Sequence, residues 1–456
     1  MAIDVSRETN APLRPPRATS GPIAWLRDNL FSSVTNSMLT LIGLYLVYVF
    51  LRGLIDWAFL SAIWNGPGGA YVSGWRVWEL VTEPWETKNA VPCRQEGSGA
   101  CWPFIANKFP QFIYGRFPFE ERWRVDLSFL MLFVGAVWLM VPRIPGKLWG
   151  ALFTFFLMPL LIFWLLNGSG AVGLGWPDYL GFALAVAGIG LLVDGRRGPG
   201  ALLGPSTRQG GGLALLLALP FLVRCLMSTS GLVHLPEVKT ELWGGLLVTL
   251  VVALVGLTGA FPIGIILALG RRSRMPLVRW ASVTFIEFVR GVPLITILFM
   301  SSVMLPLFLP EGVTFDKLLR ALIGVMLFQG AYMAETIRGG LQAIPRGQFE
   351  AADALGLSYR LKMTFIILPQ ALKLVIPGIV NSFVGLFKDT SLVLIIGLFD
   401  LLGIVQLNSN ADPNWSAPTT NMTGYVFAAA IFWFFCYGIS RYSQSVERRL
   451  SAGERK

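Results

Sequence analysis

The sequence predicts an all-α, polytopic membrane protein with about ten transmembrane helices. Of its 456 residues, 54% are hydrophobic and only 14% are charged, whereas a soluble domain carries about a quarter charged residues. Apolar runs long enough to cross a bilayer of about 30 Å recur along the chain. Lys and Arg concentrate in alternate loops between these runs, as expected when basic loops stay on one side of a membrane.

The composition excludes several other classes of protein. The high apolar content excludes a disordered chain, and a total of 4 cysteines excludes a small disulfide scaffold. A net charge of +11 would suggest nucleic-acid binding in a soluble protein. The placement of the basic residues in loops explains this charge better, so no nucleic-acid partner is expected.

The chain begins with a polar, proline-containing segment, 1–36, which is predicted to be a disordered cytoplasmic arm. The first apolar run starts near Met38 and is longer than the core of a signal peptide, so it is expected to remain as a transmembrane helix. The apolar runs predict ten spans in total. These cover 38–59, 126–142, 148–166, 178–194, 213–230, 242–270, 282–309, 318–340, 371–396 and 424–446.

The orientation follows from the charge of the short loops. Loops 167–177 and 407–423 contain no Lys or Arg, whereas the loops that alternate with them are basic. Basic loops stay in the cytoplasm. Both termini, including the tail 447–456, are therefore expected to be cytoplasmic.

The segment 60–125 is then a long external loop, rich in Trp, Pro and Gly, which is expected to fold against the membrane surface. Cys93 and Cys101 both lie in this loop. In an oxidising compartment such a pair can form a disulfide. Spacing alone leaves a disulfide and two free thiols as alternatives, because the bond depends on geometry.

The chain divides into an accessory N-terminal region, 37–230, and a core, 242–446, with the boundary in the external turn 231–241. Spans of the first region carry few polar groups, whereas those of the core hold nearly all the polar, Gly and Pro irregularities. No convincing internal repeat relates the two regions. The inverted-repeat signature of many secondary transporters is therefore missing.

The cytoplasmic segment 345–369 predicts a short helix–turn–helix that stands off the membrane. Pro345 suits a helix start, acidic residues suit the first turns, and Gly356 permits a sharp turn between the two helices. Small residues such as Ala351 and Ala354 would let another protein approach closely. The alternative is an amphipathic helix that only rests on lipid.

The spacing of this segment resembles the signature loop of ABC-importer permeases: Glu-Ala-Ala, three residues, Gly, nine residues, Ile, one residue and Leu-Pro. Three further segments resemble the permeases for polar amino acids: 288–294, 331–340 and 388–392. The resemblance covers about 242–446, a five-helix type I permease core. The extra N-terminal spans resemble the larger permeases of general L-amino-acid importers in Gram-negative bacteria.

By this resemblance the chain is a permease subunit of an ATP-driven ABC importer that moves polar L-amino acids across a bacterial inner membrane. The loop would be a coupling helix that inserts into a groove of a cytoplasmic ATPase. The implied contact residues are Glu350, Ala351, Ala352, Asp353, Leu355 and Gly356.

The same resemblance implies further partners besides membrane lipid. These are a periplasmic amino-acid-binding protein and a second, homologous permease, with a heterodimer favoured over a homodimer. The sequence has no G-x-x-x-x-G-K-[ST] loop, so ATP is expected to bind a partner subunit.

Lys388 and Asp389 are adjacent charges in an otherwise apolar span, where an unpaired charge costs on the order of a few kcal/mol. They are predicted to line the substrate pathway, with Asp389 binding the ammonium group of an amino acid and Lys388 its carboxylate. Thr390 and Ser391 would supply hydroxyl groups. The alternative is a structural ion pair near the membrane edge.

Two acid–arginine pairs with a spacing of three residues are predicted at the inner ends of neighbouring spans. Each is expected to be a structural ion pair on one helix face, and the first precedes a helix-breaking segment with gating as its alternative role. The residues concerned are Glu287, Arg290, Gly291, Pro293, Glu335 and Arg338.

The sequence offers no convergent cluster suited to catalysis or metal binding, and His234 is its only histidine. No enzyme activity, catalytic residue, metal or resident cofactor is therefore expected. The alternative function is a self-sufficient, ion-coupled secondary amino-acid transporter built around Lys388 and Asp389, which would need no ATPase.

Overall fold

The computed structural model describes residues 22–64, 93, 97–141, 143–168, 235–308, 310, 315–413 and 415–452, together with a few isolated positions between 181 and 222. Within these residues the chain is helical, and its only β contacts are isolated bridges. Six helices there are long and apolar enough to cross a membrane, or seven if one bent pair is counted as a span. The all-α, polytopic prediction is confirmed.

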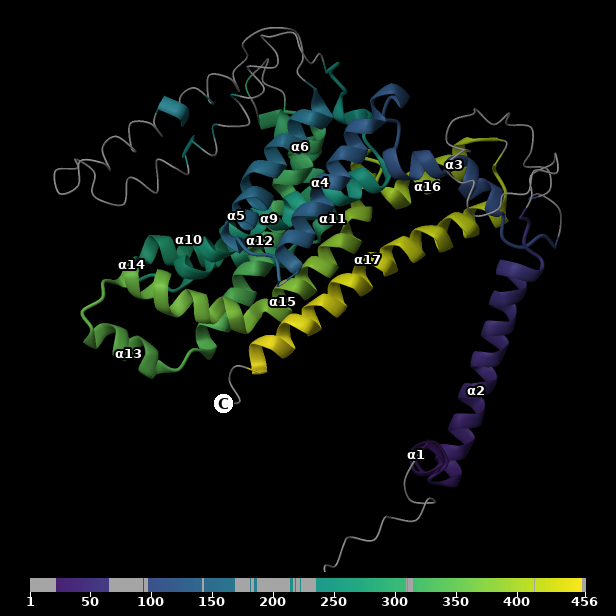
Figure 1. The fold of residues 1–456 in the computed structure, drawn as a ribbon, viewed down its shortest axis with the longest axis horizontal. Helices are drawn as coiled ribbons and strands as arrows, with labels where there is room; N and C mark the ends of the chain where they lie inside the picture. The colour runs from purple at the N-terminus through teal and green to yellow at the C-terminus, as the bar shows by residue number, and fades with distance from the viewer. Residues whose placement is uncertain are drawn as a thin grey trace, which may run out of the picture.

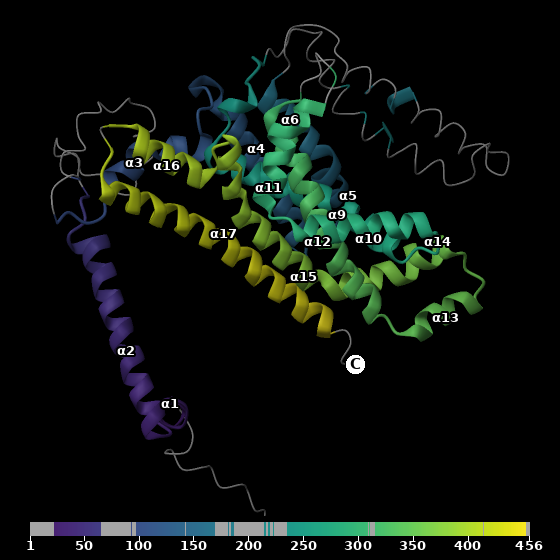
Figure 2. The same ribbon diagram turned by 180° about the vertical axis from the view of Figure 1, so that it is seen from behind.

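The N-terminal region contributes a long helix that lies apart from the rest of the molecule, as Figures 1 and 2 show. This helix, α2 (Val34–Ile55), has no buried residue and continues as η1 (Asp56–Leu60). The predicted disordered arm is wrong over part of its length, because Pro22–Leu30 forms α1. Pro22 suits the first turn of a helix, and an apolar pattern follows it.

The helices on either side of the loop near Arg143 agree with the predicted spans 126–142 and 148–166. The first begins as η4 (Phe119–Glu121) and α4 (Arg122–Met140). The second runs without interruption through α5 (Lys147–Leu152), η5 (Phe153–Leu157) and α6 (Met158–Asn167). The predicted spans 178–194 and 213–230 and His234 lie outside the described residues.

Two parallel helices form the centre of the core, α9 (Gly245–Arg271) and α12 (Lys317–Ala343). Their backbones approach closely because α9 presents glycine at the contact: a Cβ on Gly264 would lie only 2.7 Å from the Cβ of Met333. Met333 and Ile337 are fully buried on this face. Inside a bilayer the hydrophobic effect does not drive helices together. Small residues instead let two backbones approach closely enough for extensive van der Waals contact.

The predicted span 282–309 is wrong as a single helix. The structure divides it into α10 (Pro276–Gly291) and a second segment that starts with α11 (Leu294–Phe299), and the two axes differ by 106°. Pro293 causes the break, since it lacks an N–H and forces Val292 out of the helical region, to φ −109° and ψ 136°. The span itself continues through η8 (Met300–Met304) and η9 (Leu305–Phe308).

The rest of the core follows the predicted order. The helix–turn–helix comprises α13 (Arg346–Ala354), α14 (Tyr359–Leu361) and η10 (Lys362–Ile367), and the next span comprises α15 (Leu368–Asp389) and η11 (Thr390–Ile396). The helices α16 (Leu401–Ala411) and α17 (Pro418–Ala452) complete the described chain. In Figure 1, α13 and the end of α17 lie at one side of the bundle, and α16 lies at the other.

A cap, formed by Cys93, residues 97–101 and helix α3 (Trp102–Tyr114), lies at the end of the core opposite α13 (Figure 1). Helix α3 packs on α9, α16 and α17, and its Phe104 and Phe112 are buried among side chains of the core. Lys108 of α3 forms an ion pair of 2.8 Å with Asp412. Part of the N-terminal region therefore completes the outer surface of the core.

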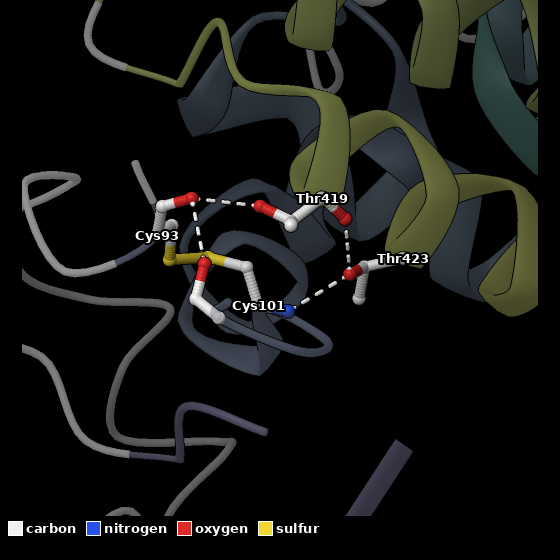
Figure 3. The surroundings of a disulfide bond; sticks show 5 residues. Cys93, Cys101, Thr419 and Thr423 are labelled. Carbon is white, nitrogen blue, oxygen red and sulfur yellow. Dashed lines mark hydrogen bonds between the residues drawn. A yellow bond between two sulfur atoms is a disulfide. The ribbon is translucent and has the colours of Figure 1, made fainter. Parts of the chain in front are cut away.

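Cys93 and Cys101 form a disulfide in this cap, with a Cα–Cα distance of 5.7 Å. Figure 3 shows how the bond lies against α17: the Cys101 N–H donates to Thr423 Oγ1 at 2.8 Å, and the Thr419 hydroxyl donates to the Cys93 carbonyl at 2.7 Å. The disulfide thus positions two backbone groups for the first turns of the last helix.

Candidate functional site

The helix–turn–helix has the geometry that its sequence predicts. Pro345 precedes the first turn of α13, and Gly356 adopts the left-handed conformation with φ +67°. The turn closes by backbone hydrogen bonds from Gly356 N–H to the Asp353 carbonyl at 2.9 Å and from Leu357 N–H to the Ala352 carbonyl at 3.2 Å. This is the standard way for a helix to end at glycine.

The residues predicted to contact an ATPase are exposed on α13 and the turn after it, except for Ala352. Glu350, Ala351, Asp353 and Leu355 are exposed, and Leu355 keeps 75% of its surface open. Ala352 is only 1% exposed. Its side chain therefore faces the protein itself, and α13 packs against η10.

An ion pair between Lys362 and Asp353 also joins η10 to α13. Ser358 caps the start of α14 by accepting a hydrogen bond from the Leu361 N–H. Packing, ion pair and cap together fix the angle between the two arms of the loop. The loop is therefore a preformed projection.

A pocket of about 390 Å³ lies at the base of α13, between the inner ends of α9 and α12. The guanidinium of Arg272 lies 5.4 Å from the centre of the Phe349 ring and donates to the Leu341 carbonyl at 3.2 Å. These contacts tie the first turn of α13 to both central helices. A displacement of α13 would therefore also move the ends of α9 and α12 that it contacts.

Glu335 is the centre of a charged network at the inner end of the core. It accepts hydrogen bonds from Arg271 at 2.8 Å and from Arg338 at 2.7 Å, and it lies 3.8 Å from Arg290. The predicted pair of Glu335 and Arg338 is confirmed. The network joins three helices, α9, α10 and α12.

The predicted pair of Glu287 and Arg290 is wrong. Glu287 instead contacts Arg271 at 2.8 Å, whereas Arg290 turns toward Glu335 and the ring of Tyr332. The cause is the bend after Gly291, which brings the end of α10 against α12 and offers each charge a partner on another helix. Sequence spacing could not identify Arg271, since its partners come from elsewhere in the chain.

Lys388 and Asp389 lie where α15 ends and the tighter helix η11 begins. Both side chains are exposed. A change from α to 3₁₀ geometry inside a span often marks a functional hinge. The two charges therefore remain candidates for the substrate pathway.

The neighbouring hydroxyl groups are engaged by the backbone. Thr390 is buried and donates to the Phe387 carbonyl at 2.9 Å, and Ser391 donates to the Lys388 carbonyl at 3.0 Å. Both bonds stabilise the end of α15. Within the described residues, the polar groups open to a substrate here are thus those of Lys388 and Asp389.

Asp400 is a buried carboxylate that caps the start of α16 and that the sequence did not reveal. It precedes α16 outside the spans, and its Oδ1 accepts from the Gly403 N–H at 2.8 Å. Its side chain is fully buried, and Oδ2 has no partner among the described residues. Burial raises the pKa of Asp400 to about 6.

Comparison with known proteins places these features in a family. The family described as "Binding-protein-dependent transport system inner membrane component" matches residues 260–452. This range includes α10, the helix–turn–helix, α15 and α17. It therefore contains every core element described above except the outer part of α9.

Two relatives match almost end to end. The inner membrane amino-acid ABC transporter permease protein YhdY of Escherichia coli (strain K12) is 43% identical over 448 residues, or 96% of this chain and 97% of that protein. The glutamate/glutamine/aspartate/asparagine transport system permease protein BztC of Rhodobacter capsulatus is 41% identical over 458 residues, or 99% of each.

Among solved structures, the crystal structure of an amino acid ABC transporter with histidines matches at 29% identity and a TM-score of 0.39, over 45% of this chain and 92% of that one. The near-complete coverage by the two sequence relatives decides the assignment. This chain belongs to the binding-protein-dependent transport system inner membrane components, as an amino-acid ABC transporter permease.

Proposed function

We propose that this chain provides one of two permease cores in an ATP-driven importer of polar L-amino acids, and that a separate ATPase drives it through α13. The printed names of the two near-full-length relatives support amino acids as the transported class. The second core would be a distinct homologous permease. A binding protein on the outer side would deliver the substrate.

The observation that carries this proposal is the preformed projection of α13. Its tip exposes Leu355 and two carboxylates, Glu350 and Asp353, on a short helix whose angle is fixed by Gly356 and by packing at Ala352. Such a shape suits insertion into a groove of another protein better than rest on a flat lipid surface.

The force would travel from α13 to the spans by direct contact. Arg272 and Phe349 join α13 to the inner ends of α9 and α12, and η10 continues into α15. ATP would bind the partner subunit, and α13 of this chain would transmit the motion of that subunit to the membrane-spanning helices. The chain itself is a transport subunit and not an enzyme.

Two features support cytoplasmic termini. The disulfide cap lies at the end of the bundle opposite α13 (Figure 1), and disulfides persist in oxidising compartments such as the periplasm. The basic loop that contains Arg271 and Arg272 lies at the α13 end. Helix α17 also ends on that side.

The coupling role of the turn is tested by comparing Gly356→Val with Gly356→Asn. A non-glycine residue costs about 1–2 kcal/mol in the left-handed conformation, more if β-branched, whereas Asn tolerates it best. Gly356→Val should therefore leave assembly of the complex intact but reduce uptake per ATP hydrolysed by about tenfold. Gly356→Asn should retain most coupling.

The measurement is uptake and ATP hydrolysis in proteoliposomes that contain the complete complex. A Cβ at Gly356 meets no atom within 4 Å, whereas its φ of +67° strains a side-chain-bearing residue, so the expected cause of a defect is backbone strain. Normal coupling in the valine variant would contradict the role assigned to α13.

A further inference from the structure

Helix α10 has two apolar faces, and only one of them is covered by protein. Ser282, Ile286 and Val289 are buried against α9 and α12. On the opposite side, Leu277 is 75% exposed, Trp280 68% and Phe288 58%. An apolar face that large needs an apolar environment.

The orientation of α10 distinguishes it from the helices that span the membrane. Its axis differs by 106° from that of the span that follows, so it lies close to perpendicular to that span. Figures 1 and 2 show it beside the inner ends of α9 and α12. A helix close to perpendicular to a span has the orientation of one that lies along a membrane surface, here at the end of the bundle that carries α13 (Figure 1).

Free positive charge accompanies the exposed face. Arg274, in the link before α10, and Arg279, in its first turn, are both exposed and have no side-chain partner among the described residues. The other arginines of this loop are engaged: Arg271 binds Glu287 and Glu335, and Arg272 covers Phe349. Two guanidinium groups therefore remain for an external anion.

We propose that α10 is an interfacial helix that binds anionic phospholipid of the cytoplasmic leaflet. Leu277, Trp280 and Phe288 would enter the boundary between headgroups and acyl chains, and Arg274 and Arg279 would contact the phosphate of the same lipids. An in-plane amphipathic helix with an aromatic anchor and arginines has the chemistry that anionic membranes bind.

Lipid fits this face better than another protein. The cores of protein interfaces are depleted in charge, whereas here two exposed arginines, Arg274 and Arg279, lie at the N-terminal end of the helix that carries the apolar face. The charges assigned to the substrate pathway are on α15, and α10 packs on α9 and α12. The occupant that matches both the apolar and the cationic part is a single amphiphile with a negative headgroup.

The first test identifies what covers the helix. The photoreactive residue p-benzoyl-phenylalanine is placed at position 280 in the full chain, co-expressed with its partner subunits, and irradiated in native membranes. Mass spectrometry should find a phospholipid adduct. The same residue at position 286, on the covered face, is the matched control and should give only crosslinks within the chain. An adduct between position 280 and the second permease or the ATPase would overturn the proposal.

The second test identifies the class of lipid. The complex is purified from membranes that contain phosphatidylglycerol and phosphatidylethanolamine, and the retained lipids are quantified. In the R274Q/R279Q variant, retained phosphatidylglycerol should fall by about fivefold for each arginine removed. The control Arg360→Gln removes an exposed arginine from α14 and should have no effect.

Equal retention of phosphatidylglycerol in R274Q/R279Q and the unchanged protein would overturn the assignment of an anionic headgroup, whatever covers Trp280. Because crosslinking and lipid retention do not depend on transport, their outcomes are independent of the proposed import activity.

Discussion

Asp389 and Asp400 are two carboxylates in contrasting surroundings. Asp389 is exposed at the end of α15, whereas Asp400 is fully buried before α16 and has one oxygen without a partner among the described residues. The first is placed to meet a ligand, and the second is placed to hold the start of a helix. Their substitutions should therefore separate a defect in substrate binding from an effect on stability.

Asp389→Asn should weaken uptake without loss of complex assembly. If Asp389 binds the ammonium group of the substrate, the change removes a charge-assisted hydrogen bond that contributes about 1.5–3 kcal/mol. The apparent KM for uptake should then rise by about tenfold or more. The control Asp28→Asn changes an exposed carboxylate on α1 and should leave uptake unchanged. Unchanged kinetics in Asp389→Asn would remove this residue from the pathway.

Asp400→Asn should stabilise the protein at pH 8 but not near pH 4. The pKa of Asp400 is raised from 3.8 to about 6, so the folded protein holds this proton more tightly than the unfolded chain. Its contribution to stability is therefore fully present at low pH and is lost as pH rises through the interval from 3.8 to about 6.

Neutral Asn avoids that loss. Each pKa unit corresponds to about 1.4 kcal/mol, part of which is offset by the lost negative charge at a helix N-terminus, so the expected gain at pH 8 is about 2 kcal/mol. Thermal unfolding midpoints of the two proteins, measured between pH 4 and pH 8, should converge at the acidic end. A constant difference across this range would contradict the buried, pH-sensitive state of Asp400.

Among the structural elements, the external cap is the one whose integrity depends on a covalent bond. Without the disulfide, the Cys93 carbonyl and the Cys101 N–H would lose their fixed positions beside Thr419 and Thr423. The double variant Cys93→Ser/Cys101→Ser should therefore destabilise the cap by about 2–4 kcal/mol. Hydrogen exchange should increase over 418–424 and stay unchanged in α9. The control Cys436→Ser removes a free thiol and should have neither effect. If exchange over 418–424 were the same, buried aromatic packing alone would hold the cap.

The sequence was sufficient to predict the elements whose cause is local. The glycine turn at Gly356 depends on conformational freedom at one residue, and the helix–turn–helix around it is confirmed. Gly291 and Pro293 are local signals of the same kind and favour a break in the span. Apolar residues on both sides of the break made the run look continuous.

Features that depend on contacts between distant segments could not be predicted. The partner of Glu287 is Arg271, on a different helix, and the burial of Ala352 depends on how α13 folds back on η10. The cap was expected as a folded external loop, but its position on α16 and α17 is set by tertiary packing of Phe104 and Phe112. Sequence spacing carries no information on these pairings.

For the whole molecule, the decisive question is whether the chain moves substrate alone. The proposed mechanism requires the ATPase and a second core, so proteoliposomes that contain only this chain should show no uptake under any imposed ion gradient. Liposomes that contain the complete complex, the binding protein and internal ATP should accumulate amino acids. Uptake by the isolated chain, driven by an ion gradient, would support the secondary-transporter alternative and refute ATP coupling.

The cap has a consequence for biosynthesis. Its hydrogen bonds to α17 join residues that are 322 and 326 positions apart, so Cys93 and Cys101 leave the ribosome long before Thr419 and Thr423. An oxidase outside the cell membrane can form the bond between Cys93 and Cys101, which are eight positions apart, while the later helices are still being translated. The surface of the cap that contacts α17 is thus formed before α17 is synthesised. In a nascent chain truncated before α17, the side chains of Phe104 and Phe112 would stay exposed on this surface, and quality-control proteases could recognise them.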